Sequence, residues 1–198
     1  MNDTYEIATL LTPKERKHLL ALKETCVSLD AHQDYNLFDC TKTQIHPKHL
    51  GMYSNKFSPI AAEALEKLAA AARERKDIGL GATVAQYFLD YTEGGFTKFH
   101  TDDDASVALT MVTLLDEQDL EGGETVLQQV YEHKARPQHK YAKRDSDDGP
   151  YGQRIVPVVV PVDVGDTMIY DKGLMHGVAK VRKGLRTVLV TWYSSKTS

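Results

Sequence analysis

The chain has 198 residues, of which 41% are hydrophobic and 26% are charged, and this composition predicts one globular domain, 1–198, with a sizeable buried core. The longest apolar run, IVPVVVPVDV at 155–164, is too short and too interrupted by proline for a membrane span. A formal net charge of −4 at pH 7 provides no general attraction to phosphate backbones, which disfavours nucleic acid as a partner.

The N-terminal sequence and the cysteines predict where the chain resides. Residues 1–20 lack the order of basic and then apolar residues that a secretory signal has, so we expect a cytoplasmic protein. Cys26 and Cys40 have no metal-type spacing, and two plain thiols in a reducing compartment are the simplest interpretation.

Two helices are predicted in the first 81 residues, which we interpret as N-terminal supporting helices and a cover segment. The first spans about 13–29, because residues 12–15 have the pattern of a capping box with proline at the first helical position. The second begins at Ser58 and Pro59 and continues to a stop at Gly79 and Gly81, since glycine favours helix termination. The stretch between them is typical of strand fragments and loop.

A β core is predicted from residue 82 to residue 195. Its β-branched and aromatic runs are separated by glycine, aspartate and proline: ATVAQYFLDY, SVALTMVTLLD, ETVLQQVY, IVPVVVPVDV, TMIYD, HGVAKVRKG and RTVLVTWYSS. Seven short strands after helices, with no alternation of strand and helix, favour an antiparallel sandwich or barrel. The fold class predicted is therefore α+β and mainly β.

One insertion loop interrupts the predicted strands at 132–154. It mixes charges of both signs with proline and glycine and has no apolar period, so we expect it to be exposed. A solvated loop and a lid that contacts substrate are both compatible with this composition.

The stretch GGFTKFHTDDD, at 94–104, contains the first candidate metal ligands. Because strand residues two apart point to the same face, His100 and Asp102 are expected to project side by side. One imidazole and one carboxylate are two members of a facial triad for a divalent transition metal, although such a pair alone also occurs in surface turns. We expect Asp103 and Asp104 to face solvent or to stabilise the turn after the strand.

A third ligand must come from elsewhere, and His176 is the strongest candidate. It opens a strand that can fold back over the sheet toward Asp102. With His100 it would complete the two-histidine, one-carboxylate triad of non-haem Fe(II) oxygenases, which leaves one face of the metal open. The other histidines lie on the first helix, in the linking segment or in the charged loop: His18, His32, His46, His49, His133 and His139.

A buried cation is predicted on the last strand. Alternation places four side chains on one face of RTVLVTWY: Arg186, Val188, Val190 and Trp192. A guanidinium on the inner face of an apolar sheet is unfavourable unless it meets an anion, and a dicarboxylate would pair with both arms of its fork. Lys180 and Arg182 are rival cations, but they precede a predicted turn at Lys183-Gly184 and are expected to be solvated.

These residues occur in a characteristic order: Tyr91, His100, Asp102, GGET at 122–125, GD at 165–166, His176, Arg186 and Trp192. The ordered set resembles the Fe(II)- and 2-oxoglutarate-dependent dioxygenases, specifically the prolyl 4-hydroxylase-like branch, over about residues 82–193. The resemblance implies a double-stranded β-helix, that is, a jelly-roll or cupin-like core. The first 80 residues match only in kind, as supporting helices.

The resemblance also implies metal and co-substrate ligands. His100, Asp102 and His176 are expected to bind Fe(II). Arg186 is expected to pair with the far carboxylate of 2-oxoglutarate, at a position where prolyl hydroxylases more often have lysine.

Three further residues match positions around the co-substrate. Tyr91 and Thr125 correspond to residues that hydrogen-bond 2-oxoglutarate, and Trp192 corresponds to an aromatic residue that lines the same pocket. Ordinary structural roles stay open for two of them, as a strand aromatic for Tyr91 and as a turn residue for Thr125.

The implied reaction hydroxylates an unactivated C–H bond while 2-oxoglutarate and O2 are converted to succinate and CO2, with ascorbate as a candidate reductant. A carboxylate at Asp102 argues against the halogenating relatives, which have a small residue there. The implied substrates are amino-acid-like, peptidyl (prolyl) or small natural-product molecules. Two alternatives are a non-enzymatic metal- or ligand-binding β-barrel and a nucleic-acid demethylase with the same chemistry. The sequence makes no prediction of the oligomeric state.

Overall fold

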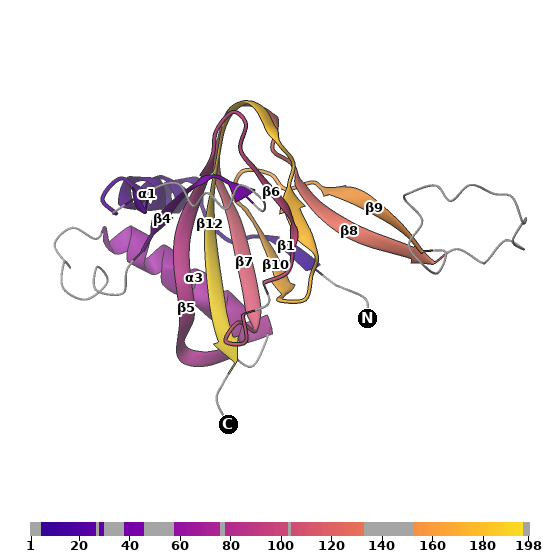
Figure 1. Ribbon diagram of the computed structural model, residues 1–198. Helices are drawn as coiled ribbons and strands as arrows, with labels where there is room; N and C mark the ends of the chain where they lie inside the picture. Colours follow the sequence, from indigo (N-terminus) through magenta and orange to yellow (C-terminus); the bar gives the residue numbers. More distant parts are fainter. Residues whose placement is uncertain are drawn as a thin grey trace, which may run out of the picture.

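The computed structural model describes residues 5–26, 28–29, 38–45, 58–75, 78–102, 104–132 and 153–195. These residues form two antiparallel sheets, with helices against one of them (Figure 1). Asp103, most of the predicted insertion loop and five of the histidines lie outside the described residues: His32, His46, His49, His133 and His139.

The larger sheet has seven strands in the order β1-β10-β7-β12-β5-β4-β2. In that order, its strands are Tyr5–Thr9, Asp166–Asp171, Leu109–Gly122, Val181–Ser195, Ile78–Tyr91, Thr41–Gln44 and Ser28–Leu29. The smaller sheet has the order β3-β6-β11-β8-β9. Its strands are Phe38–Asp39, Phe96–His100, His176–Val178, Thr125–Glu132 and Gln153–Val160.

Successive strands alternate between the sheets from β5 to β8 and again from β9 to β12. Each connection therefore crosses from one layer to the other, which winds the chain into a double-stranded β-helix with an interior between the layers. The predicted α+β, mainly β, jelly-roll class is confirmed. Beyond the two layers, β8 and β9 continue as a paired ribbon that projects to one side (Figure 1).

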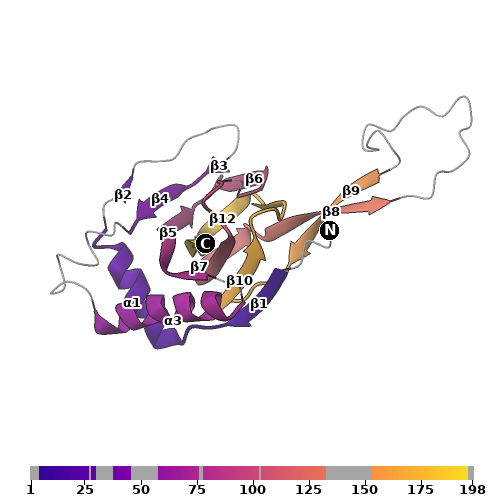
Figure 2. The ribbon, with the colours of Figure 1, turned by 90° about the horizontal axis from the view of Figure 1, so that it is seen from below.

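Two helices, α1 (Pro13–Lys23) and α3 (Pro59–Arg75), lie against the outer face of the larger sheet (Figure 2). Leu19 and Leu68 from the helices are completely buried against Phe88, Met111 and Leu189 of the sheet. The alternate residues of the same strands face the interior between the sheets. None of the helices in the described ranges combines the length and the apolar character that a membrane crossing needs.

The start of α1 is confirmed, because its signal is local. Thr12 Oγ1 accepts a hydrogen bond from the Glu15 N–H at 3.2 Å, and Glu15 Oε2 accepts one from the Thr12 N–H at 2.6 Å, which together form the predicted capping box. The predicted end at residue 29 is wrong, since α1 ends at Lys23. Both the N–H and the hydroxyl of Thr25 donate to the Leu22 carbonyl, and this local bonding replaces another helical turn.

Three other features of the secondary structure also differ from the prediction. The second helix ends at Arg75 and not at Gly79, which lies inside β5, because pairing of β5 with β12 outweighs the local signal of glycine. The edge strand β1 pairs with β10 although residues 5–9 gave no strand prediction. The predicted turn at Lys183-Gly184 is a bulge within continuous β12, where Gly184 has φ +86° and a Cβ would collide with the Gln118 carbonyl oxygen.

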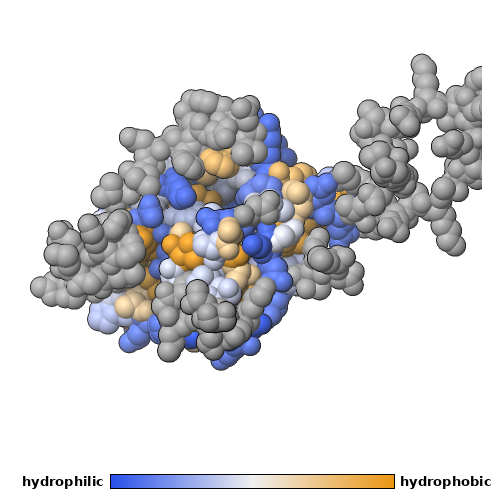
Figure 3. Space-filling view, turned by 60° about the horizontal axis from the view of Figure 1, so that its bottom comes forward, coloured by the Kyte–Doolittle hydropathy of each residue, from blue (hydrophilic) through white to orange (hydrophobic). Residues whose placement is uncertain are grey.

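Hydrophilic and hydrophobic residues are mixed on the surface, and on the face in Figure 3 the hydrophobic ones gather near the centre. The exposed large hydrophobic residues come from separate segments: Tyr5, Val84, Phe99, Val159 and Val164. Single exposed apolar side chains are normal on a globular protein. The interior between the two sheets is therefore a better candidate for a functional site than the surface.

Candidate active site

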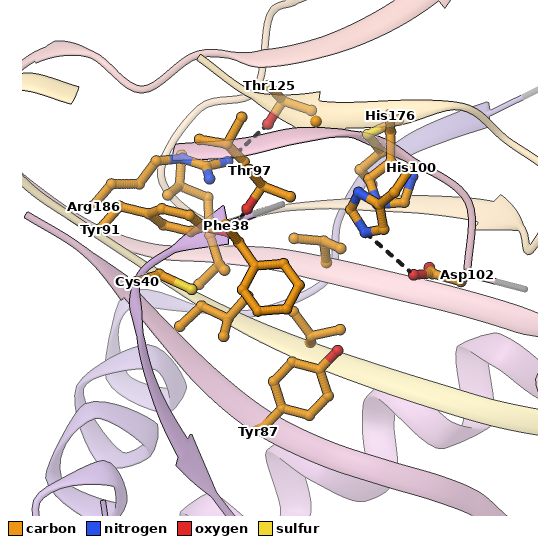
Figure 4. A pocket seen from close by; sticks show the side chains of 18 of the residues that line it. Phe38, Cys40, Tyr87, Tyr91, Thr97, His100, Asp102, Thr125, His176 and Arg186 are labelled. Atoms are coloured by element: carbon orange, nitrogen blue, oxygen red, sulfur yellow. Dashed lines mark hydrogen bonds and ion pairs between the residues drawn. The ribbon is translucent and has the colours of Figure 1, made fainter. Parts of the chain in front are cut away.

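A cavity of about 260 Å³ lies between the two sheets. Its walls contain all seven residues that the sequence singled out: Tyr91, His100, Asp102, Thr125, His176, Arg186 and Trp192. Figure 4 shows the histidines and Asp102 on one side of the cavity and Arg186, Tyr91 and Thr125 on the other. The predicted metal ligands and the predicted residues around Arg186 therefore share one cavity.

The two histidines meet because their strands are neighbours. In the smaller sheet β6 pairs with β11, and the register places His176 directly opposite His100. Their ring centroids are 4.3 Å apart. Directly opposed residues in an antiparallel pair have neighbouring Cβ atoms on the same face, so the register alone brings the two imidazoles together.

Asp102 lies just beyond the end of β6 and not within the strand as predicted. Its backbone N–H donates to the Lys172 carbonyl at 3.0 Å, and its Oδ2 accepts a hydrogen bond from Thr110 Oγ1 at 2.7 Å. The other carboxylate oxygen, Oδ1, lies 3.7 Å from His100 Nε2. Two hydrogen bonds to the rest of the fold therefore hold this buried carboxylate against the histidine pair.

The acidic residue at 104 has the structural role that the sequence predicted as one option. Asp104 Oδ1 accepts hydrogen bonds from the N–H and the hydroxyl of Ser106, at 2.8 and 2.6 Å. This bonding stabilises the turn between β6 and β7, and it lowers the pKa of Asp104.

The ring orientation of both histidines directs Nδ1 to the backbone and leaves the lone pair on Nε2. His100 Nδ1 lies 3.0 Å from the Lys98 carbonyl, and His176 Nδ1 lies 3.0 Å from the Leu174 carbonyl. A carbonyl oxygen only accepts, so each Nδ1 carries the proton and each Nε2 of the neutral ring has the lone pair. Burial lowers the pKa of His176, and His100 lowers it further against the opposing effect of Asp102, which favours the neutral, ligating form.

These three side chains fit a divalent metal ion. One ligand atom from each of His100, Asp102 and His176 can be chosen so that all lie within 4.8 Å of one another. Two imidazoles and a carboxylate form the donor set of a facial triad, and the remaining coordination positions would face the cavity. In the described part of the chain this is the one such group of three or more ligand side chains.

Sequence reasoning missed a hydroxyl group that contacts the triad. The Tyr170 hydroxyl lies 2.9 Å from His176 Nε2, and because that nitrogen has the lone pair, the tyrosine is the donor. Tyr170 on β10 is paired with Thr110 on β7, which donates to Asp102. Only the register of β10 and β7 brings these two hydroxyls to the site, and neither TMIYD nor SVALTMVTLLD carries a local signal for it.

The other side of the cavity contains a buried cation. Arg186 is 3% exposed, and in register it lies between Tyr91 on β5 and Glu117 on β7. Its Nη2 donates to Thr125 Oγ1 at 2.8 Å, and its guanidinium carbon lies 5.7 Å from the centroid of the Tyr91 ring. Among the described residues no carboxylate is within ion-pair distance of Arg186. A guanidinium stays protonated in proteins, and Glu117 attracts it only from beyond ion-pair distance, so this charge lacks a close counter-ion among the described residues.

The two aromatic side chains from the prediction also line the cavity. The Tyr91 hydroxyl is 3.0 Å from Thr97 Oγ1, and burial raises the Tyr91 pKa, so the phenol remains neutral. Trp192 packs edge-on against Tyr87, with ring centroids 5.6 Å apart. Its indole N–H is buried and has no hydrogen-bond partner among the described residues.

Of the rival cations, His18 and the two cysteines, only Cys40 lines the cavity. Lys180 and Arg182 are exposed, as expected for the rival cations. His18 lies on α1, and its Nδ1 contacts the Ser58 hydroxyl at 2.8 Å. Cys26 and Cys40 are free thiols, and burial raises the pKa of Cys40 to about 11, so this cavity-lining thiol is protonated at neutral pH.

Comparison with known proteins shows which solved structures are similar to this fold. No protein-family profile and no curated protein sequence matches the chain. A prolyl-4-hydroxylase from Pseudomonas putida is similar in structure with a TM-score of 0.60 and 15% identity, over 99% of this chain and 95% of that one. A prolyl hydroxylase from Trichoplax adhaerens, in complex with a hypoxia inducible factor peptide fragment, gives 0.62 and 12%, over 98% and 84%.

A third similar structure has a different kind of bound molecule. HygX from Streptomyces hygroscopicus, with nickel, 2-oxoglutarate and hygromycin B bound, gives a TM-score of 0.61 and 14% identity, over 98% of this chain and 84% of that one. The resemblance to Fe(II)/2-oxoglutarate oxygenases of the prolyl 4-hydroxylase-like branch is therefore confirmed at the level of the fold.

Proposed function

We propose that this chain is an Fe(II)- and 2-oxoglutarate-dependent dioxygenase that hydroxylates an unactivated C–H bond. One observation carries the proposal. The triad of His100, Asp102 and His176 shares one small cavity with Arg186, a buried guanidinium that lacks a carboxylate partner in the described structure. A metal ion would bind to the triad, and a dicarboxylate would supply the counter-ion of Arg186.

The metal ligands have defined tasks in this proposal. His100 and His176 would bind Fe(II) through Nε2, because Nδ1 of each donates to a backbone carbonyl that fixes the ring. Asp102 would supply the anionic ligand, positioned by Thr110. Bound iron would supply the oxidative chemistry, in which 2-oxoglutarate and O2 yield succinate and CO2 and one oxygen atom is inserted into the substrate C–H bond.

The other end of the cavity would bind the co-substrate. Arg186 would pair with the far carboxylate of 2-oxoglutarate, in place of the missing protein counter-ion. Thr125 Oγ1 already accepts from Arg186, so its own hydroxyl proton is free to be donated to the same carboxylate. Tyr91 would line this subsite, and the buried side chains Leu114 and Val188 would exclude water from it. Trp192, which the sequence assigned to the same pocket, lines the cavity six residues farther along β12, where it is paired with Thr110.

The size of the cavity favours a small substrate or one inserted side chain. About 260 Å³ is slightly below the usual range for drug-sized ligand pockets. Amino-acid-like molecules, a prolyl residue of a peptide and a small natural product are the candidate classes. We also propose that residues 1–198 act as a single domain whose β core at 82–195 contains the site, that the protein is cytoplasmic and that ascorbate keeps the iron reduced.

Substrate-stimulated succinate formation tests the proposed activity. The chain is incubated with Fe(II), 2-oxoglutarate, ascorbate and panels of amino acids, prolyl peptides and small natural products, and succinate and O2 consumption are measured. We expect one class to stimulate succinate release, and His100→Ala and Asp102→Ala to abolish it, while Lys180→Met at an exposed position has no effect.

Each other outcome has a defined meaning. Retained turnover in His100→Ala or Asp102→Ala would refute the proposal. Binding of iron and 2-oxoglutarate without any O2 consumption would indicate a non-enzymatic binding protein. Stimulation by DNA or RNA, together with salt-dependent binding, would indicate a demethylase.

A further inference from the structure

A second cation lines the same cavity and has no task in the proposed chemistry. Lys42 lies on β4, where it is paired with Leu89 of β5. Alternation along β4 puts Cys40 and Lys42 on the same face, and both line the cavity together with Leu89. The inward direction of the lysine thus follows from the strand register.

The surroundings of Lys42 leave its charge without a counter-ion. Its Nζ lies 3.9 Å from the centroid of the Tyr87 ring, and burial lowers its pKa. Among the described residues no carboxylate lies within ion-pair distance of this nitrogen. By contrast Lys23, a lysine whose side chain is 14% exposed, lies 2.9 Å from Asp90 Oδ1. A desolvated ammonium group without an anion is unfavourable unless a ligand supplies one.

Tyr87 connects this lysine to the candidate metal centre. The ring that lies under Lys42 also packs edge-on against Trp192. The Tyr87 pKa is raised by burial and then by the negative charge of Asp102, which places the phenol within electrostatic reach of the triad. In Figure 4 the Tyr87 hydroxyl points into the cavity, and Arg186 lies at the far side.

Two unpaired cations in one cavity indicate two anions. Arg186 is held by Thr125 beside Tyr91, and the proposed function assigns it to the co-substrate. Lys42 lies beside a different aromatic ring, that of Tyr87, which in turn packs against Trp192. Because no carboxylate of the described residues pairs with Lys42, the second anion would come from another molecule that enters the cavity, namely the substrate to be oxidised.

We propose that Lys42, Tyr87 and Trp192 form the subsite for the primary substrate, and that this subsite selects molecules with an apolar or aromatic portion next to a negatively charged group. The charged group is a carboxylate or a phosphate, which both satisfy an ammonium donor. That the ligand of this subsite is the substrate to be oxidised rests on the proposed function. The existence of the subsite does not.

The chain's only tryptophan provides a direct measurement, because Trp192 itself lies at this subsite. Trp192 fluorescence is titrated with 3-phenylpropionate, with its uncharged analogue 3-phenylpropanamide and with phenyl phosphate, in the full chain with and without Mn(II) and 2-oxoglutarate. We expect at least one of the two anions to bind about tenfold more tightly than the amide, the effect of one net charge interaction. The tighter of the two anions identifies the charged group.

Four variants locate the binding. We expect Lys42→Met, which removes the charge and keeps an unbranched apolar chain, to remove the preference for the anion, and Lys42→Arg to retain it with an unchanged circular dichroism spectrum. Arg186→Met and the exposed-site control Lys180→Met should keep the preference. The affinity for 2-oxoglutarate should fall in Arg186→Met and stay unchanged in Lys42→Met.

Several results would overturn the subsite. These are equal binding of acid and amide, no anion-dependent change in the wild-type chain, or a preference that survives in Lys42→Met. Loss of the preference in Arg186→Met alone would show that the probes bind at the co-substrate position. Loss of 2-oxoglutarate binding in Lys42→Met would assign Lys42 to the co-substrate and leave the proposed function standing. Absence of 2-oxoglutarate binding in every form would refute the proposed function without deciding the subsite.

Discussion

Tyr170 occupies the nitrogen atom that the metal would need. Its hydroxyl donates to His176 Nε2 at 2.9 Å, so a metal ion that binds this lone pair must displace the hydrogen bond. A second hydroxyl, that of Thr110, contacts Asp102 without blocking its other oxygen. The hydroxyl of Tyr170 therefore competes with metal binding, whereas Thr110 orients a ligand.

We expect Tyr170→Phe to bind divalent metal more tightly than the wild-type chain. Removal of a single net hydrogen bond of about 1 kcal/mol corresponds to a gain of roughly fivefold in affinity. The dissociation constants for Mn(II) and Zn(II) are measured by equilibrium dialysis. Tyr5→Phe is the matched control, since Tyr5 is paired with Tyr170 on neighbouring strands but is 38% exposed. Weaker metal binding in Tyr170→Phe would show that the hydroxyl supports the occupied site.

At the scale of elements, the short strand β11 decides the geometry of the triad. It lies between β6 and β8, and its central residue, Gly177, follows the ligand His176 directly. A Cβ at Gly177 would be 2.7 Å from the Thr97 carbonyl oxygen and 3.3 Å from the Lys98 carbonyl oxygen. The close approach of β11 and β6, which brings the histidines together, therefore requires glycine here.

We expect Gly177→Ala to weaken metal binding more than tenfold and to lower the thermal unfolding midpoint by several degrees, because the added methyl group forces β11 away from β6. Gly173→Ala is the control, since a Cβ at Gly173 has no atom within 4 Å and its substitution should leave both quantities unchanged. Metal affinity and the midpoint are measured on the same samples. Equal behaviour of the two variants would contradict the assigned role of β11.

The same contrast between local and non-local interactions explains how much the sequence predicted. The start of α1 was predicted because Thr12 and Glu15 bond to each other. The ligand types were predicted because metal chemistry restricts them to few residues. The end of the second helix, strand β1 and the contact of Tyr170 with His176 were not, since each depends on pairing between segments far apart in the chain. The unpaired charge of Lys42 depends likewise on the register of β4 and β5.

At the scale of the whole molecule, four tyrosines are buried in or beside the two-layer core. Burial raises the pKa of each of them: Tyr87, Tyr91, Tyr170 and Tyr193. Their phenols keep the proton in the folded state at pH values where the unfolded chain has lost it. The folded state then binds more protons than the unfolded state, so the free energy of unfolding falls as the pH rises.

We expect these tyrosines to have little effect on the urea unfolding midpoint below about pH 9. Above about pH 10, the ordinary pKa of tyrosine, the midpoint should fall steeply. Spectroscopic titration of the ten tyrosines should show a subset that ionises only when the chain unfolds. If all ten ionised near pH 10 with the circular dichroism spectrum unchanged, the four phenols would not be buried as described.

The most direct test of the whole account is isothermal titration calorimetry of 2-oxoglutarate into the Mn(II)-loaded chain. A metal triad and an unpaired arginine in one cavity require that 2-oxoglutarate binds tightly only when the metal is present, and that Arg186→Met and Asp102→Ala each weaken it at least about tenfold. Equal binding with and without Mn(II), or full affinity in Arg186→Met, would contradict the account.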